Sequence, residues 1–130
     1  MVWYLDTSAF VKLVRDERDS GALTEWTAGR GICSSDLLRT EARRALSAAD
    51  EAGQARLEWL IEQMWLIRLA PDVFDDAGRL RTHASLRSSD AIHIAAATRL
   101  GPDLEGIATY DGRMAAAASE LGIAVAAPAQ

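Results

Sequence analysis

The sequence predicts a single α/β domain over residues 1–130, in which a central parallel sheet of about five strands is flanked by helices. Short apolar runs alternate along the chain with longer segments in which apolar residues recur at helical spacing. Such alternation is typical of parallel sheets covered by helices on both faces. The length of 130 residues suits one domain, and 49% hydrophobic with 25% charged residues is an ordinary globular composition.

The first half of the chain contains two predicted strands and four predicted helices. The strands are short apolar runs, and in the helices apolar residues repeat at i, i+3 and i+4. Gly53 is expected to stop the long helix, because glycine commonly follows a helix end. The predicted elements are a strand at Val2–Leu5, a helix at Ser8–Arg15, a short helix at Ala22–Trp26, a strand at Gly31–Ser34, a long helix at Asp36–Ala52 and a helix at Leu57–Met64.

The second half alternates in the same way and completes the predicted sheet. Pro71 ends a strand, Gly78 is expected to interrupt a helix, and Gly101 with Pro102 stops the next one. Ser88 or Ser89 is available to cap that helix. The predicted elements are a strand at Leu66–Leu69, a helix at Asp72–Arg81, a helix at Ser88–Leu100, a strand at Gly106–Thr109, a helix at Arg113–Leu121 and a strand at Ile123–Ala126.

Several features of the composition indicate a cytoplasmic protein that does not cross a membrane. No apolar run approaches the roughly 18 residues that a membrane-spanning helix needs. The N-terminus has no basic region before its apolar residues, so it does not resemble a signal peptide. Cys33 is the only cysteine, which excludes an intramolecular disulfide, and its apolar surroundings in the sequence predict a small core residue.

The charge balance restricts how this chain can bind a nucleic acid. The formal net charge is −5, from 19 acidic and 14 basic residues, and Lys12 is the only lysine. An acidic protein repels phosphates on average. If RNA or DNA is the substrate, bound cations must bridge the acids to the phosphates, or arginines must cluster locally.

Three aspartates stand where an α/β fold places its ligands. Asp6 follows the first predicted strand, Asp111 follows the fourth, and Asp90 lies at the start of a helix. Ligands bind beyond the carboxyl ends of parallel strands. Each aspartate alone is also explained as a helix cap, because aspartate favours the N-terminus of a helix.

Glu41 adds a carboxylate that helix capping does not explain. On a helical wheel it lies in the middle of the apolar face formed by Leu37, Leu38, Ala45 and Ala48. Burying a carboxylate in an apolar stripe is costly unless it is paired or binds a cation. Two interpretations of Glu41 are therefore open: it is a metal ligand, or it forms a buried ion pair with a distant arginine. Clustered carboxylates suit Mg²⁺ or Mn²⁺, whereas one cysteine and two histidines offer no spacing of a structural zinc site.

These acids stand in motifs that resemble a known family. The segments Leu5-Asp-Thr-Ser-Ala9, Leu38-Arg-Thr-Glu-Ala42, Leu86-Arg-Ser-Ser-Asp-Ala-Ile-His-Ile-Ala95 and Thr109-Tyr-Asp-Gly-Arg-Met114 resemble the PIN-domain ribonucleases. The likeness is greatest to the VapC-type toxins of type II toxin–antitoxin (VapBC) pairs, and it extends over nearly the whole chain.

The resemblance implies a metal-dependent endoribonuclease with a PIN-like fold. Asp6, Glu41, Asp90 and Asp111 would hold Mg²⁺ or Mn²⁺, and a water activated by the metal would attack the phosphodiester bond of RNA. The resemblance also implies a cognate VapB-type antitoxin that blocks the site, a homodimer and a toxin–antitoxin hetero-oligomer. Trp59 is an independent indication of a protein interface, because it lies opposite the apolar stripe of its predicted helix.

Further polar residues flank the acidic motifs. Thr7, Ser8 and Thr109 stand beside the acids, where they can bond to substrate, metal water or carboxylate, or serve as caps. His93 follows Asp90 by one helical turn, so it either faces the site or packs as a hydrogen-bonded core residue. Arginines are candidates for contacts with the RNA backbone. They are Arg39, Arg43, Arg87 and Arg113.

Three alternatives to a nuclease are less consistent with the sequence. A phosphotransferase or phosphoacceptor using Asp6 would hold a lysine on a later strand, but the only lysine lies in the first helix. A nucleotide-binding Rossmann or P-loop protein is excluded because neither glycine motif occurs. A non-catalytic PIN-like module that binds RNA or protein would be expected to lack one of the four acids, and all four are present.

Overall fold

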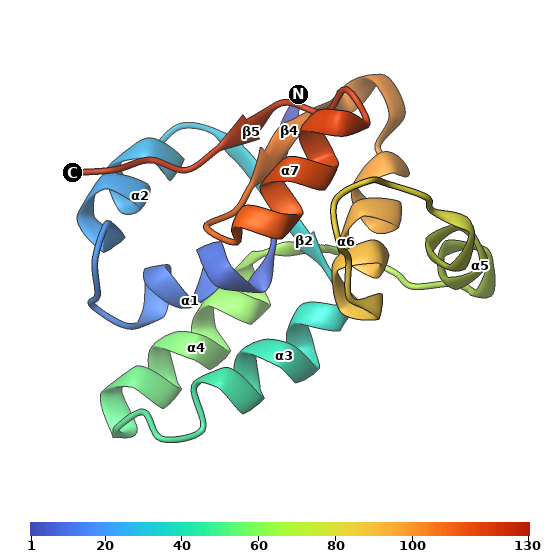
Figure 1. The fold of residues 1–130 in the computed structure, drawn as a ribbon. Coiled ribbons are helices and arrows are strands. Elements are labelled where there is room, and N and C mark those ends of the chain that lie inside the picture. The colour runs from blue at the N-terminus through green and yellow to red at the C-terminus, as the bar shows by residue number, and fades with distance from the viewer.

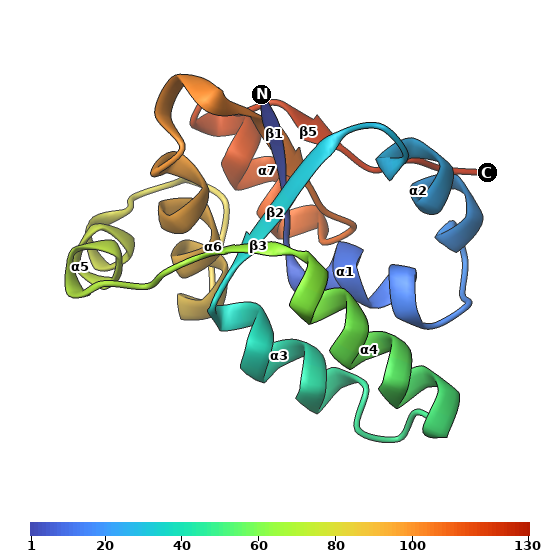
Figure 2. The same ribbon diagram turned by 180° about the vertical axis from the view of Figure 1, so that it is seen from behind.

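The predicted parallel sheet is present in the computed structural model, which describes all 130 residues. Its five strands are all paired in parallel, in the order β3-β2-β1-β4-β5 (Figure 1, Figure 2). The predicted α/β fold class is therefore confirmed. The strands are β1 (Val2–Leu5), β2 (Gly31–Ser35), β3 (Trp65–Ile67), β4 (Leu104–Ala108) and β5 (Val125–Ala126).

Seven α-helices and one short 3₁₀ helix at Gly101–Asp103 surround the sheet. None of the helices combines the length and the apolar character that crossing a membrane requires. The α-helices are α1 (Thr7–Val14), α2 (Ser20–Thr27), α3 (Leu37–Ala45), α4 (Glu51–Gln63), α5 (Pro71–Arg79), α6 (Ser88–Thr98) and α7 (Gly112–Glu120).

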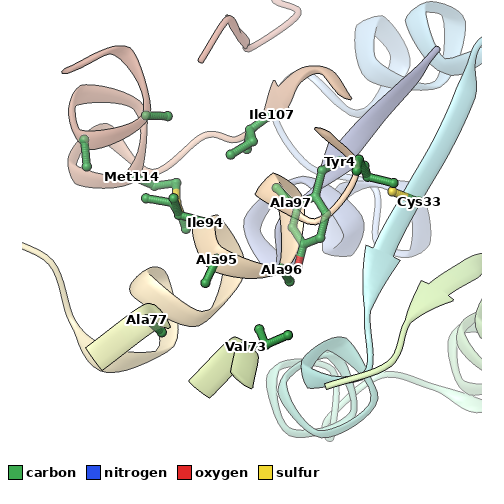
Figure 3. Close-up of a cluster of buried hydrophobic side chains, with 13 residues drawn as sticks. Tyr4, Cys33, Val73, Ala77, Ile94, Ala95, Ala96, Ala97, Ile107 and Met114 are labelled. Carbon is green, nitrogen blue, oxygen red and sulfur yellow. The ribbon is translucent and has the colours of Figure 1, made fainter. Parts of the chain in front are cut away.

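The core lies on both faces of the sheet because successive side chains of a strand point to opposite sides. Tyr4 and Ile107 face α6 and α7, where Ile94 and Met114 complete the largest buried cluster (Figure 3). The next residues along the two strands, Leu5 and Ala108, belong to a separate cluster with residues of α1 and α2. A third cluster joins α1, α3 and α4. Cys33 is buried as predicted, and burial raises the pKa of its thiol to about 12.

The long helix predicted at Asp36–Ala52 is wrong, because the chain breaks between α3 and α4. Helix α3 ends at Ala45, and Asp50 caps α4, with its Oδ1 accepting a bond of 2.8 Å from the backbone N–H of Gly53. Gly53 therefore lies in the first turn of α4 and does not end a helix, contrary to the prediction. Buried Leu46 anchors the connection between the helices. Gly78 likewise lies inside α5 without interrupting it.

Candidate active site

Two of the predicted site residues follow the central strands β1 and β4. Leu5 pairs with Ala108 in the parallel ladder, so the chain leaves both strands at one edge of the sheet. Asp6 begins α1, and its Oδ1 accepts from the backbone N–H of Ala9 at 3.0 Å. Asp111 begins α7 in the same manner, with Oδ1 accepting from the Arg113 N–H at 2.9 Å. Both aspartates therefore cap a helix and also stand at the edge where ligands bind.

The Asp6 carboxylate is buried and fully engaged by hydroxyl groups. Ser8 Oγ donates to Oδ1 at 2.7 Å, and Thr109 Oγ1 donates to Oδ2 at 2.5 Å. Burial raises the pKa of Asp6 above its usual range, although the bonds from Ser8 and Thr109 and the nearby His93 counter part of the shift. Ser8 and Thr109 thus fix the orientation of this carboxylate.

Arg87 bridges the other two aspartates, Asp90 and Asp111. Its Nη2 lies 3.1 Å from Oδ2 of Asp111, and its Nε lies 3.4 Å from Oδ2 of Asp90. The backbone N–H of Arg87 also donates to Asp90 at 3.2 Å. Arg87 itself occupies the N-cap position of α6, so the expectation of a cap at Ser88 or Ser89 is wrong. Asp90, three residues later, stabilises the start of α6, because its carboxylate accepts a hydrogen bond from the backbone N–H of Arg87.

Glu41 lies at the border of the apolar face of α3, and not in its middle. Leu38 and Ala42 are buried, but Ala45 and Ala48 are exposed because the chain turns away after Ala45. The side chain of Glu41 is 27% exposed. The alternative of a buried ion pair with a distant arginine is wrong, because the carboxylate pairs with His93 and forms no salt bridge with an arginine.

The partners of Glu41 are Thr7 and His93, and both donate to Oε1. Thr7 Oγ1 and His93 Nε2 each lie 2.6 Å from this oxygen. Burial acts to raise the pKa of Glu41, but the bonds from His93 and Thr7 outweigh it and hold the pKa below its usual range. Glu41 is thus held as an ionised carboxylate at the edge of a cavity.

His93 fulfils both of the roles considered for it, because it is a core residue that also borders the site. It is 2% exposed. Its Nδ1 lies 2.6 Å from the hydroxyl oxygen of Tyr4, and that hydroxyl donates to Ser35 Oγ at 2.8 Å. Tyr4 and Ser35 were not predicted as part of this network. The available signal was a tyrosine in a buried strand, whose hydroxyl needs a partner.

All four acids line one small cavity of about 140 Å³, and none of its lining residues is hydrophobic. In this conformation, no group of three or more His, Cys, Asp or Glu side chains is arranged to hold a metal ion. The Arg87 guanidinium offsets the charge of two of the acids instead. The lining residues are Asp6, Thr7, Ser8, Glu41, Arg87, Ser89, Asp90, His93 and Asp111.

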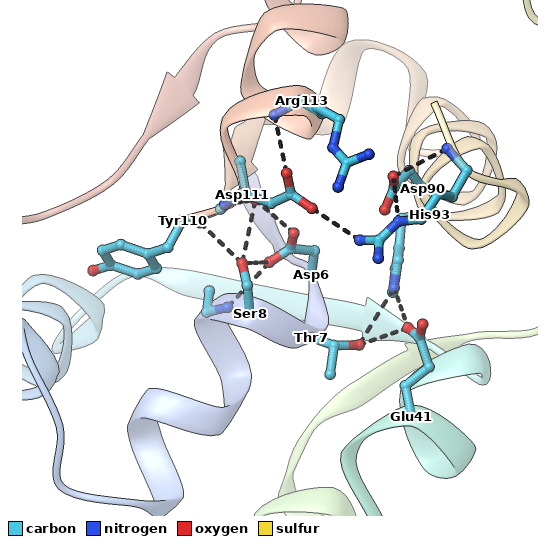
Figure 4. Close-up of polar contacts among 12 residues, drawn as sticks. Asp6, Thr7, Ser8, Glu41, Asp90, His93, Tyr110, Asp111 and Arg113 are labelled. Carbon is cyan, nitrogen blue, oxygen red and sulfur yellow. Dashed lines mark hydrogen bonds and ion pairs between the residues drawn. The ribbon is translucent and has the colours of Figure 1, made fainter. Parts of the chain in front are cut away.

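The four predicted RNA-binding arginines divide into two pairs. Arg87 lines the cavity, and Arg113 extends beside Asp111 on the side that faces Asp90 (Figure 4). Arg39 pairs with Asp36 at 3.0 Å, and Arg43 pairs with Glu58 at 2.8 Å, both on exposed surface outside the cavity lining. Only the first pair is close to the acids.

The family is shown by comparison with known proteins. The family model of the PIN domain matches residues 3–120, and the chain therefore belongs to the PIN-domain family. Ribonuclease VapC46 of Mycobacterium tuberculosis (strain ATCC 25618 / H37Rv) is 44% identical over 126 residues, covering 96% of either chain. Ribonuclease VapC35 of M. tuberculosis (strain CDC 1551 / Oshkosh) is 37% identical over 133 residues, covering 98% of this chain and 97% of the relative. Within the PIN family, this chain falls among the VapC proteins.

Solved structures show the same fold at low sequence identity. VapC20 of M. tuberculosis, a sarcin–ricin loop cleaving toxin, has a TM-score of 0.78 at 16% identity and covers 98% of this chain and 100% of its own. VapBC2 from Rickettsia felis, bound to a DNA fragment from its promoter, has a TM-score of 0.63 at 17% identity and covers 85% of this chain and 88% of its own.

Proposed function

We propose that this VapC protein is the toxic component of a type II toxin–antitoxin pair and cleaves RNA in a reaction that requires Mg²⁺ or Mn²⁺. The convergence of four carboxylates on one polar cavity at the carboxyl edge of the sheet carries the proposal. The curated relatives bear the name ribonuclease, which supports RNA as the substrate.

The donor set fits a hard divalent cation. Asp6, Glu41, Asp90 and Asp111 offer only oxygen atoms, which are the ligands that Mg²⁺ and Mn²⁺ prefer. These four residues would hold the ion, and Arg87 would give up its bridging position. When bound, a divalent ion offsets phosphate charge and promotes the ionisation of water.

The surrounding side chains orient the acids and attract the substrate. Ser8 and Thr109 hold the Asp6 carboxylate, while Thr7 and His93 hold that of Glu41. These bonds position the acids before substrate binds, so less reorganisation is needed during the reaction. Arg87, once released from the acids, and Arg113, which lies beside Asp111, would bind phosphate oxygens of the RNA backbone.

The partners in this proposal are RNA, a VapB-type antitoxin and a second copy of the chain. The solved structure of VapBC2 supports an antitoxin partner, since the fold of the matched VapBC2 chain resembles the fold of this chain. Trp59 projects from α4 with 54% of its surface exposed, which suits a protein interface. The homodimer and the hetero-oligomer rest on the family resemblance together with this exposed side chain.

The proposal is tested by incubating purified protein with total RNA in Mg²⁺, in Mn²⁺ or in EDTA, and mapping the cut ends. The matched control is Asp111→Asn, because asparagine still caps α7 while it removes the charge. We expect discrete cuts that require the metal and disappear in the variant. Binding of RNA without cutting would favour the non-catalytic module, and cutting that survives in Asp111→Asn would point to a contaminating nuclease or a different site.

A further inference from the structure

A second and larger cavity, of about 530 Å³, adjoins the candidate active site. It lies between α5, the segment of residues 80–87 and the start of α6, and we call it the α5–α6 groove. Arg87 lines both this groove and the acidic cavity. The two cavities therefore meet at Arg87.

The α5–α6 groove differs from the acidic cavity in the charge and polarity of its lining residues. Half of its fourteen lining residues are hydrophobic, and none is acidic, although the chain has 19 acidic residues. Two arginines, Arg81 and Arg87, belong to the lining. Phe74 contributes an aromatic ring that is 46% exposed. The groove thus combines apolar surface with positive charge.

The 80–87 segment is held in place, so the groove is preformed. Arg81 Nη1 donates to the carbonyl oxygens of Gly78 and Leu80 at 2.9 and 2.8 Å. The carboxylate of Glu120 on α7 accepts from the backbone N–H of His83 at 2.8 and 3.0 Å. A preformed groove costs less to occupy than one that must first be ordered.

We propose that the α5–α6 groove is a nucleotide subsite, which binds the unstacked base of the RNA nucleotide next to the scissile phosphate. The inference rests on the proposed function and deepens it. Unpaired RNA bases stack on aromatic rings, so the exposed ring of Phe74 provides the stacking surface. Arg87 lies at the junction of the two cavities, where the connecting phosphate passes. A volume of about 530 Å³ lies within the range of small-molecule sites.

The test uses metal-free protein, so that binding is measured without cleavage. A fluorescently labelled single-stranded RNA of mixed sequence is titrated in EDTA with wild type, Phe74→Leu and Phe74→Tyr, and anisotropy is recorded. Leucine keeps an apolar side chain and removes the ring, whereas tyrosine keeps the ring. We expect Phe74→Leu to bind about tenfold more weakly and Phe74→Tyr to bind within about twofold of wild type.

A second measurement locates the base directly and separates the two proposals. Titration with each of the four nucleoside 5′-monophosphates should shift the amide resonances of Gly78, Ala84 and Ala91, which line the groove. If wild type cleaves RNA but Phe74→Leu binds RNA normally and these amides do not move, the subsite is wrong and the function stands. If these amides move but no RNA is cleaved, the groove binds nucleotides, but the proposed function fails and the position next to a scissile phosphate fails with it.

A third readout tests the competing occupant, a second copy of this chain. Light scattering after size-exclusion chromatography gives the oligomeric state of wild type and Phe74→Leu over a range of concentrations. An unchanged oligomer supports the nucleotide subsite. A dimer that dissociates in Phe74→Leu would show that the groove is a self-interface and would overturn the inference.

Discussion

Nε2 of His93 lies 2.6 Å from Oε1 of Glu41, and this contact joins the buried helix α6 to the exposed helix α3 at the candidate site. The other ring nitrogen lies 2.6 Å from the hydroxyl of Tyr4 in β1. A line of hydrogen bonds thus runs from the central strand to a carboxylate at the cavity. The position of Glu41 depends on the core and not on α3 alone.

Glu41→Gln should abolish RNA cleavage while the fold survives. The amide oxygen of glutamine can still accept from Thr7 and His93, but it lacks the charge that a divalent ion needs. We expect activity to fall by at least about 100-fold and the free energy of unfolding to change by no more than about 1 kcal/mol. Cleavage assays and urea denaturation measure the two effects. Full activity in this variant would make Glu41 a structural partner of His93 only.

His93→Ala should lower both stability and activity. The substitution opens a cavity and removes one hydrogen-bond partner each from the Tyr4 hydroxyl and the Glu41 carboxylate, which we expect to cost about 3 kcal/mol. Ser35 and Thr7 remain as their other partners. Tyr4→Phe, which removes only the hydroxyl at the far end of the network, should cost about 1 kcal/mol and retain most activity. Urea denaturation and RNA cleavage check both variants. Wild-type cleavage by folded His93→Ala would show that Glu41 needs no positioning.

Arg87→Gln should bind Mn²⁺ more tightly than wild type yet cleave RNA more slowly. Arg87 competes with a cation for Asp90 and Asp111, and its loss leaves their charges uncompensated. We expect about fivefold tighter binding of Mn²⁺, measured as a larger rise in melting temperature on metal addition. Arg99→Gln is the matched control, since Arg99 bridges Asp72 and Asp76 on the surface. An equal Mn²⁺ response in both variants would contradict competition at the site.

Glu17→Gln should destabilise the protein at neutral pH but not in acid. Burial acts to raise the pKa of Glu17, but hydrogen bonds from Lys12 and Arg15 outweigh it and hold the pKa below the ordinary value of 4.5. In the range between the two pKa values, the folded state therefore binds fewer protons than the unfolded chain. The contribution of ionised Glu17 to the free energy of unfolding is present above pH 4.5 and is lost as the pH falls through the lower pKa of the folded state. At pH 7 we expect a loss below about 1 kcal/mol.

Urea denaturation of wild type and Glu17→Gln across the pH range from 7 to about 3 measures this difference. Lys12→Met should lose most of the same pH-dependent part, because Lys12 lies 3.2 Å from Glu17. A difference between wild type and Glu17→Gln that stays constant with pH would show that the ion pair contributes nothing. Lys12 also donates to the Arg18 carbonyl oxygen at 2.7 Å, so the only lysine is engaged in structure.

Most elements with a regular apolar period were predictable from the sequence to within one or two residues, but α4, expected at Leu57–Met64, already begins at Glu51. Helix α1 was expected at Ser8–Arg15 and lies at Thr7–Val14, and β1 lies where it was predicted. The break between α3 and α4 was missed, because alanine supports a helix on both sides of it. The break depends on the Asp50 cap and on the burial of Leu46. Only the cap is a local sequence pattern, because the burial of Leu46 depends on tertiary packing.

The sequence by itself determined the α/β class, the family and the four acids that stand together, because strand ends, helical periods and motifs are local properties of the chain. Only the tertiary structure decided what surrounds those acids. The Tyr4–His93–Glu41 network joins residues from three elements, and Arg87 reaches Asp111 across 24 positions of sequence. Such contacts depend on how α6 packs between the sheet, α3 and the start of α7. No local period records that packing, so the network and the arginine bridge were visible only in the fold.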